Sequence, residues 1–329
     1  MKFTLNSVSS LRGDINIPAD KSLSHRAVMF NSIASGKAKI SNFLMGEDCL
    51  STIDVLSKLG VEIQVENNSV YTYGKGLESL NEPNDTLYVG NSGTTIRLMS
   101  GVLAGRKFKS ILDGDSSIRK RPMKRIIDPL TMMGANISAN NNNDNAPILF
   151  DGGTLTSLDY DLPVASAQVN SSILLAGLAA GIGIEIIEPV QTRDHTERML
   201  LAMGADIKTD NTITTIQKSK LQAQNIVIPS DISSAAFWMV LGACHPNAEI
   251  LLPNIGLNPN RTGILEVLIE MGANITVNNK DVKLNGIIDR IDMFNGGLRI
   301  IDYKSGLVNQ GVLDLKNMAN REISTNERV

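Results

Sequence analysis

The pattern of apolar and polar positions repeats one unit four times along the chain. An amphipathic helical pattern covers residues 49–59, 123–133, 196–203 and 263–271, and each copy ends in Leu-Gly or Met-Gly followed by an alternating run. The glycines stand at positions 60, 134, 204 and 272, so successive copies lie 74, 70 and 68 residues apart. The sequence therefore predicts repeated βα-rich modules of roughly seventy residues.

Each of these glycines marks a helix end, where a left-handed backbone costs glycine little. Asparagine-containing reversals at residues 67–68, 140–145, 210–211 and 278–279 then lead into a return strand. Three modules fill residues 18–227, and a fourth begins near Ile228. We expect an α/β fold in which the helices of similar modules pack together inside, with sheets around them.

The pattern changes near residue 284. Alternating runs at Ile287–Phe294 and Leu298–Tyr303 flank Asn295-Gly296, which predicts a β-hairpin with a type I′-like turn. Residues 317–329 are polar and are expected to fray. This change of composition is a candidate boundary.

Bulk composition excludes several classes of function. The 329 residues carry a net charge of −3, so global electrostatics favours neither nucleic acid nor an anionic membrane as partner. A signal peptide and a bilayer-spanning run are not visible in the sequence. Cys49 and Cys244 lack the spacing of a metal or redox site, which predicts reduced thiols in the cytoplasm.

The stretch Asp20–Arg26 has the composition of an anion-binding loop. It follows a short alternating run and enters an apolar helical run at Ala27. Free backbone N–H groups and the helix dipole favour a phosphate or carboxylate there. Lys21 adds a point charge and Arg26 a planar fork. The alternative is a solvated loop in which Ser22 or Ser24 only caps the helix.

Two further loops combine cations with small polar residues. Residues 90–97, Gly-Asn-Ser-Gly-Thr-Thr-Ile-Arg, let the backbone approach a ligand closely and place Arg97 in a first helical turn. Residues 115–123 contain Arg119 and Arg121 before Pro122, a residue suited to the first position of a helix. A solvated run of charge is the alternative for the second loop.

Two weaker signals lie further along the chain. Ser166 and Gln168 enter an apolar helix and either cap it or hydrogen-bond a polyhydroxylated ligand. Residues 191–197 contain Arg193 and His195, with Thr192 or Asp194 as a possible cap. His25 and His195 are expected to be hydrogen-bonding partners, and no metal site is expected.

The cationic loops recur at strand-to-helix junctions of repeated modules, so they are expected to point toward one cleft. A slightly acidic chain that concentrates cations on such loops suits small, highly anionic ligands. These cations are Lys21, Arg26, Arg97, Arg119, Arg121 and Arg193.

Taken together, the motifs at residues 20–26, 90–97, 119–123, 166–168 and 192–197 resemble the family of 5-enolpyruvylshikimate-3-phosphate (EPSP) synthase, also called 3-phosphoshikimate 1-carboxyvinyltransferase. The resemblance runs from about Gly13 to Asn279. A related enolpyruvyl transferase that acts on UDP-N-acetylglucosamine uses a reactive Cys in its catalytic loop. The corresponding loop here, residues 119–122, contains no Cys.

The resemblance implies an inside-out α/β barrel of repeated βαβαββ units arranged in two lobes. It also implies transfer of the enolpyruvyl group of phosphoenolpyruvate to the 5-hydroxyl of shikimate 3-phosphate, with release of phosphate and without metal or organic cofactor. The reaction serves the chorismate branch of aromatic amino acid biosynthesis, and a monomer is expected. An acid must protonate the methylene group and a base must accept the hydroxyl proton.

By resemblance, Lys21 is the catalytic residue in this chain. The implied shikimate 3-phosphate ligands are Lys21, Ser22, Arg26, Ser166, Gln168 and Arg193. The implied phosphoenolpyruvate ligands are Lys21, Gly93, Arg121 and Gln168, supported by Asn91, Thr94 and Arg97.

The resemblance also implies six repeats, of which this sequence shows four. Counterparts of the second-lobe catalytic Asp and of a Lys-Glu-Ser-Asp-Arg-like segment are not found after Asn279. We therefore expect a complete lobe at residues 18–227, a partial second lobe from 1–17 with 228–284, and an unrelated tail at 285–329. Such a C-terminally truncated chain is predicted to bind shikimate 3-phosphate weakly and to turn over negligibly. The alternative is an inactive anion-binding remnant fused to a nuclease-like fragment, which the tail suggests.

The tail has a resemblance of its own. Residues 286–306 look like the core hairpin of RecB-type nucleases, in which an Asp and an Asp-x-Lys bind a divalent metal and activate water. Asp289, Asp302 and Lys304 match that motif. A plain surface hairpin explains the alternation equally well. We expect a fused fragment without nuclease activity.

Overall fold

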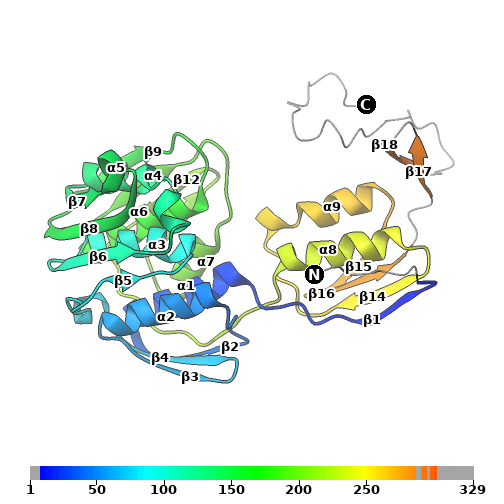
Figure 1. Ribbon diagram of the computed structural model, residues 1–329, viewed down its shortest axis with the longest axis horizontal. Coiled ribbons are helices and arrows are strands. Elements are labelled where there is room, and N and C mark those ends of the chain that lie inside the picture. The colour runs from blue at the N-terminus through cyan, green and yellow to red at the C-terminus, as the bar shows by residue number, and fades with distance from the viewer. Residues whose placement is uncertain (1–7, 287–289, 295–296, 302–329) are drawn as a thin grey trace. The chain divides into compact units, whose positions relative to one another are not determined.

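The computed structural model describes residues 8–286, 290–294 and 297–301 (Figure 1). The chain forms two compact units. The first unit is Ala19–Pro229, and the second combines Met1–Pro18 with the chain from Ser230 onward. The description of one complete and one partial lobe stays a prediction.

Four sheets of four strands share one topology, which accounts for the sequence repeat. In each sheet one outer pair is parallel and the other two pairs are antiparallel. The first unit holds three of them: β13 (Ile226–Val227), β2 (Ser35–Ser41), β4 (Ser69–Lys75) and β3 (Glu62–Glu66); β5 (Leu87–Tyr88), β6 (Lys109–Asp113), β8 (Asn145–Gly153) and β7 (Ala135–Ala139); and β9 (Leu158–Asp161), β10 (Ile184–Ile187), β12 (Ile213–Ile216) and β11 (Ile207–Asp210). The second unit holds β1 (Leu11–Asp14), β14 (Ala248–Leu252), β16 (Asp281–Asn285) and β15 (Asn274–Asn278).

Two strands pair with strands that are far away in the sequence. β1 precedes the first helix but pairs in parallel with β14, with Leu11 opposite Ala248. β13, near the end of the first unit, pairs in parallel with β2, with Ile226 opposite Ile40. Each unit therefore closes its first sheet with a strand that is far away in sequence.

The helices alternate with these strands. They are α1 (Lys21–Ile33), α2 (Glu47–Lys58), α3 (Gly93–Ala104), α4 (Lys124–Met132), α6 (Ala167–Ala180), α7 (His195–Ala202), α8 (Ile232–Cys244) and α9 (Gly263–Glu270). Short helical turns are η1 (Leu77–Ser79), η2 (Ile118–Lys120), η3 (Pro259–Arg261) and α5 (Asn140–Asn143). Figure 1 shows α1 and α2 along one face of the sheet of β2, β4 and β3. None of the described helices is both long and apolar enough to cross a bilayer.

The core of the first unit lies between its helices. α1, α3 and α6 are buried over almost their whole length, so the prediction of helices inside and sheets outside is confirmed for this unit. α3 and α6 approach closely because residue 101 is Gly: a Cβ there would lie 2.0 Å from the carbonyl oxygen of Ser172. The α/β fold class is confirmed.

The glycines of the repeat have the backbone that the sequence predicts. φ is +92° at Gly60, +100° at Gly134, and +90° at Gly204 and Gly272. Asparagines at the reversals also have positive φ, among them Asn67, Asn141, Asn142, Asn211 and Asn279. Asparagine tolerates this conformation because its side chain hydrogen-bonds locally.

Two helices begin earlier than their apolar runs. α1 begins at Lys21 instead of Ala27, and α3 begins at Gly93 instead of Arg97. The first turn of each helix is polar and contributes to the lining of a cavity, with Lys21 from α1 and with Gly93 and Thr94 from α3, so apolar periodicity starts late. The segments that were expected to be loops therefore include helix N-terminal turns.

The predicted hairpin of the tail is present. β17 (Arg290–Phe294) pairs antiparallel with β18 (Gly297–Ile301). The turn residues Asn295 and Gly296 lie outside the described residues. So do Asp289, Asp302 and Lys304, on which the nuclease resemblance depends.

Candidate anion-binding site

Three helix N-termini of the first unit are capped by side chains that the motifs supply. Asp20 accepts a hydrogen bond from the backbone N–H of Leu23 at 2.8 Å. Ser92 accepts one from Thr95 at 3.2 Å, and Ser166 one from Val169 at 3.4 Å. Asp20 caps α1, so the alternative in which Ser22 or Ser24 is the cap is wrong. Ser166 caps α6, which agrees with one of the two interpretations that the sequence left open.

A cavity of about 300 Å³ collects all four predicted phosphoenolpyruvate ligands and the three residues predicted to support them. Their positions come from the first turns of α1, α3 and α6 and from the loops before α3 and α4. The lining residues are Lys21, Asp48, Asn91, Gly93, Thr94, Arg97, Arg121 and Gln168. All of them except Asp48 are predicted site residues.

Two guanidinium groups converge on Gly93. A Cβ at this position would lie 2.8 Å from Nη1 of Arg121 and 2.9 Å from Nη1 of Arg97. Burial lowers the pKa of Arg97, and the nearby charges of Arg121 and Arg125 lower it further. Mutually repelling cations at a cavity wall are stabilised when an anion enters between them.

Neutral groups hold these cations in place. Gln168 Oε1 accepts a hydrogen bond from Nη1 of Arg97 at 2.8 Å, and Gln168 Nε2 donates to Thr94 Oγ1 at 3.1 Å. Asn91 Oδ1 accepts a hydrogen bond from Arg121. Gln168 thereby links α6 to α3, and the fork of Arg121 is oriented across the cavity.

Lys21 forms an ion pair with Asp48 at the cavity edge. The side chain of Lys21 is 50% exposed and that of Asp48 is 21% exposed, so half of the Lys21 side chain is open to solvent. Sequence reasoning missed Asp48. It stands in the first turn of α2, and only the contact between α1 and α2 reveals it.

A second hollow of about 260 Å³ shares Arg97 and Gln168 with the first. Ser166 and Arg125 also line it. Sequence reasoning missed Arg125, which lies in the first turn of α4 just after the motif that contains Arg121.

The remaining predicted residues meet in a second cluster. Ser22 Oγ accepts a hydrogen bond from Nη1 of Arg193 at 3.2 Å, which links α1 to the loop before α7. Arg26 is 2% exposed, and its Nε donates to Thr196 Oγ1 at 2.7 Å. Its Nη2 donates to Ser171 Oγ at 3.2 Å. Arg26 therefore joins three helices below the surface, and direct contact of this residue with a ligand stays a prediction.

A chain of hydroxyl groups links α1, α2 and α3. His25 Nδ1 lies 2.7 Å from Thr52 Oγ1, which lies 2.6 Å from Thr95 Oγ1, which lies 2.6 Å from Ser92 Oγ. Burial, followed by the charge of Lys21, lowers the pKa of His25 to about 3. His25 is therefore neutral and acts as a hydrogen-bonding partner, as predicted. Among the described residues, no three His, Cys, Asp or Glu side chains gather as a metal site would require.

Arg119 is a correction to the predicted set of cations. Its Nε donates to Asp113 Oδ1 at 2.9 Å, and its Nη2 pairs with Oδ2. The hydrogen bond from Arg119 lowers the pKa of Asp113. Arg119 does not line the cavity, because this bidentate pair anchors η2 to the end of β6 instead.

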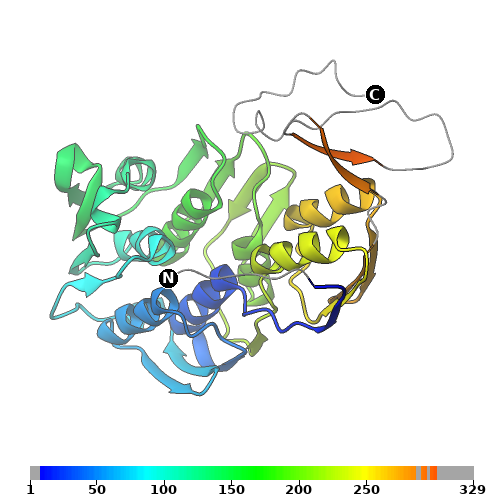
Figure 2. The same ribbon diagram turned by 45° about the vertical axis from the view of Figure 1, so that its right-hand side comes forward.

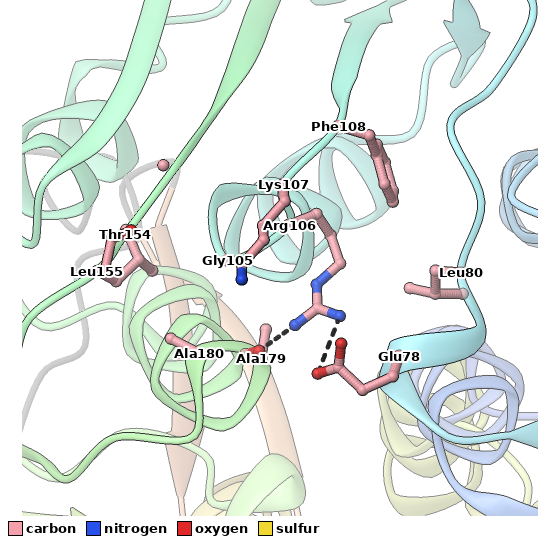
Figure 3. A pocket seen from close by; sticks show the side chains of 11 residues that line it. Glu78, Leu80, Gly105, Arg106, Lys107, Phe108, Thr154, Leu155, Ala179 and Ala180 are labelled. Carbon is pink, nitrogen blue, oxygen red and sulfur yellow. Dashed lines mark hydrogen bonds and ion pairs between the residues drawn. The ribbon is translucent and has the colours of Figure 1, made fainter.

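The C-terminal ends of α3 and α6 border another cavity, of about 410 Å³ (Figure 3). The Arg106 guanidinium hydrogen-bonds the carbonyl oxygens of Ala179 and Leu77 there and lies 3.4 Å from Glu78. A cation at helix C-termini satisfies free carbonyl groups. Arg106 therefore has a structural role at this cavity, where it joins the end of α3 to the end of α6 and to η1.

Comparisons with known proteins agree with this geometry. The family model of EPSP synthase (3-phosphoshikimate 1-carboxyvinyltransferase) matches residues 5–295. The chain belongs to the EPSP synthase family. The match extends beyond the stretch 13–279 on which the motifs were recognised, and the nuclease resemblance of residues 286–306 is not borne out.

Several relatives are named 3-phosphoshikimate 1-carboxyvinyltransferase. The protein of Bacillus licheniformis is 50% identical over 275 residues, which are 83% of this chain and 64% of that protein. The protein of Herpetosiphon aurantiacus is 46% identical over 303 residues, 91% of this chain and 70% of that protein. A solved structure of EPSP synthase from Acinetobacter baumannii matches with a TM-score of 0.80 at 44% identity, covering 84% of this chain and 65% of that one. The chain therefore spans a little under two thirds of the length of the B. licheniformis protein, and the same holds for the protein of Bacillus subtilis, of which it covers 63%.

Proposed function

We propose that the first unit binds the two substrates of an enolpyruvyl transfer reaction, phosphoenolpyruvate and shikimate 3-phosphate. The single observation that carries this proposal is the cavity in which Lys21, Arg97 and Arg121 surround a glycine wall at Gly93. Its charge suits the phosphate and carboxylate groups of phosphoenolpyruvate, which gain charge-assisted hydrogen bonds from guanidinium groups.

Shikimate 3-phosphate is proposed to bind beside this cavity. Ser22 and Arg193 already contact each other, and Ser166 and Gln168 begin α6 next to Arg97. The two proposed ligand groups share Lys21 and Gln168, so both substrates would lie close enough to react. Proximity of this kind supplies a large part of the rate enhancement of two-substrate enzymes.

In the proposed reaction the 5-hydroxyl of shikimate 3-phosphate gives its proton to a base and bonds to C2 of phosphoenolpyruvate, while an acid protonates the methylene carbon. The tetrahedral intermediate then loses a proton from the methyl group as the bond to phosphate breaks, which restores the carbon–carbon double bond and releases phosphate. Lys21 is the proposed catalytic group of this chain, because its half-exposed side chain borders the cavity beside Asp48. Arg97 and Arg121 would stabilise the phosphate as its charge changes. Monomeric state, location in the cytoplasm and negligible turnover by this chain stay predictions.

Calorimetry tests the proposal. Shikimate 3-phosphate should bind the full chain, and phosphoenolpyruvate should bind more tightly in its presence if the two sites are coupled. Arg121→Met should abolish the second binding step. Lys120→Met is the matched control, since Lys120 carries the same charge on the same loop but does not line the cavity. Equal affinities of both variants for phosphoenolpyruvate would contradict the proposed site.

A further inference from the structure

The helices α6 and α7 meet at a buried pair of polar side chains. Asn170 is fully buried and Glu197 is 8% exposed. Nδ2 of Asn170 donates a hydrogen bond to Oε1 of Glu197 at 3.1 Å. The function proposed above assigns no role to either residue.

The other half of this pair lacks a donor. Oε2 of Glu197 and Oδ1 of Asn170 are both buried, and neither has a hydrogen-bond partner among the residues that the structure describes. Two buried acceptors without a donor are costly, and a buried carboxylate is costlier still. A proton on Oε2 supplies the donor that is needed: the acid O–H can donate to Oδ1 while the amide N–H donates to Oε1.

The surroundings of Glu197 also favour the neutral acid. Its pKa is raised to about 7, chiefly by burial, and the carboxylates of Glu188, after β10, and Asp194, before α7, act in the same direction. The guanidinium of Arg26 on α1 acts in the opposite direction. From α6 the facing group is the neutral Asn170.

The pair lies next to the second cluster of the proposed site. Thr196, the neighbour of Glu197, accepts a hydrogen bond from Nε of Arg26 at 2.7 Å and lies 2.6 Å from Ser171 Oγ. An ionised Glu197 could no longer donate a hydrogen bond to Asn170. Its negative charge would also attract the Arg26 guanidinium away from these hydroxyl groups.

We propose that Glu197 is a positioning residue, a neutral acid paired with Asn170 that fixes α7 to α6 and so keeps Thr196 on Arg26 beneath the shikimate 3-phosphate site. Loss of its proton loosens this junction and weakens ligand binding. The effect on binding rests on the proposed function, whereas the acid–amide pair does not.

Two measurements test the pair on the full chain. Infrared difference spectra of wild type against Glu197→Gln should show a protonated carboxyl band at pH 6 that disappears as the pH rises to 8.5. Calorimetry should show that the affinity of wild type for shikimate 3-phosphate falls about tenfold over the same range, because the competent fraction falls. Glu197→Gln, whose amide can keep both hydrogen bonds, should retain the affinity seen at pH 6.

Glu188→Gln is the matched control. It removes a buried carboxylate near Glu197 without touching Asn170, so the pH transition should persist with its midpoint moved to lower pH. Identical pH profiles for wild type and Glu197→Gln, or no carboxyl band at pH 6, would overturn the proposal. Failure of every protein to bind shikimate 3-phosphate would contradict the proposed function, while the infrared band would still decide whether Glu197 is neutral.

Discussion

The two units use the same module and bury it to different extents. In the first unit, α1, α3 and α6 are enclosed, and Phe30 of α1 is fully buried. In the second unit, α8 begins with the same kind of Asp cap, Asp231, and lies against a sheet of the same topology. Yet Phe237 of α8 is 81% exposed. Figure 2 shows α8 and α9 of this unit in a second view.

The exposed face of the second unit is apolar. It comprises Phe237, Trp238, Val240 and Leu241 of α8 with Val267 and Ile269 of α9. One module covers one face of its helix with a sheet, and three modules are needed before each helix is also covered by two others. The helix of a module therefore becomes buried only when several modules pack together, because a single module leaves part of its apolar surface in water.

Charge separates the units as well. The first turn of α1 reads Lys-Ser-Leu-Ser, with Arg26 one turn later, whereas that of α8 reads Ile-Ser-Ser-Ala. The shared module supplies a capped helix N-terminus in both units. The cations of α1 belong to the helix itself, whereas the guanidinium at the start of α8 comes from Arg261, which hydrogen-bonds Ser233 and lies 3.7 Å from Asp231.

The largest expected effect comes from the two phenylalanines. Phe30→Ala should lower the free energy of unfolding by about 3–5 kcal/mol, because it leaves a cavity in a closed core. Phe237→Ala should change it by about 0.5 kcal/mol or less, since the ring is already in water. Urea unfolding followed by circular dichroism measures both. A large loss for Phe237→Ala would mean that this face is covered in solution.

Two helix glycines give the next largest difference. Gly101→Ala should cost about 3 kcal/mol, because the new Cβ would lie 2.0 Å from a backbone oxygen of α6. Gly242→Ala of α8 meets Leu284 Cβ at 3.2 Å and Ile250 Cδ1 at 3.3 Å, so side chains can adjust and about 1 kcal/mol is expected.

Fluorescence separates the two glycine variants. Trp238, the single Trp of the chain, reports the second unit, whereas circular dichroism reports both units. Gly101→Ala should shift the circular dichroism transition and leave the fluorescence transition in place. Coincident shifts of both transitions would show that the units unfold together.

Two first-turn glutamates distinguish α7 from α9. The pKa of Glu197 is raised from 4.5 to about 7 in the folded protein, so the folded chain holds more protons than the unfolded chain between these values. Stability should therefore fall by roughly 2 kcal/mol as the pH rises through this window, and Glu197→Gln should remove most of that fall. The exposed Glu266 of α9 is the matched control. Chemical unfolding at pH 5 and pH 8 measures both slopes.

The sequence was sufficient for the features that depend on local rules. Glycine at helix ends and asparagine at reversals follow from backbone preferences within a few residues, so Gly60 could be recognised. Asp20 was not recognised as the cap of α1, because α1 begins at Lys21 and not at its apolar run. Asp48 and Arg125 were missed, because their roles arise only when α2 and α4 pack beside other modules. Arg119 was grouped with the cations expected to point toward one cleft, because charge alone does not reveal its partner Asp113.

The smallest expected effect concerns two glycines that begin helices, Gly93 of α3 and Gly263 of α9. A Cβ at Gly93 would meet the guanidinium ends of Arg97 and Arg121, which are flexible enough to move, whereas a Cβ at Gly263 would meet nothing within 4 Å. Gly93→Ala should therefore leave stability almost unchanged and weaken phosphoenolpyruvate binding about tenfold, or about 1.4 kcal/mol, by displacing both cations. Gly263→Ala should leave affinity unchanged and raise stability by about 0.5 kcal/mol. Calorimetry and urea unfolding of both variants decide whether the cavity depends on the missing side chain at residue 93, because equal affinities would place the anion elsewhere.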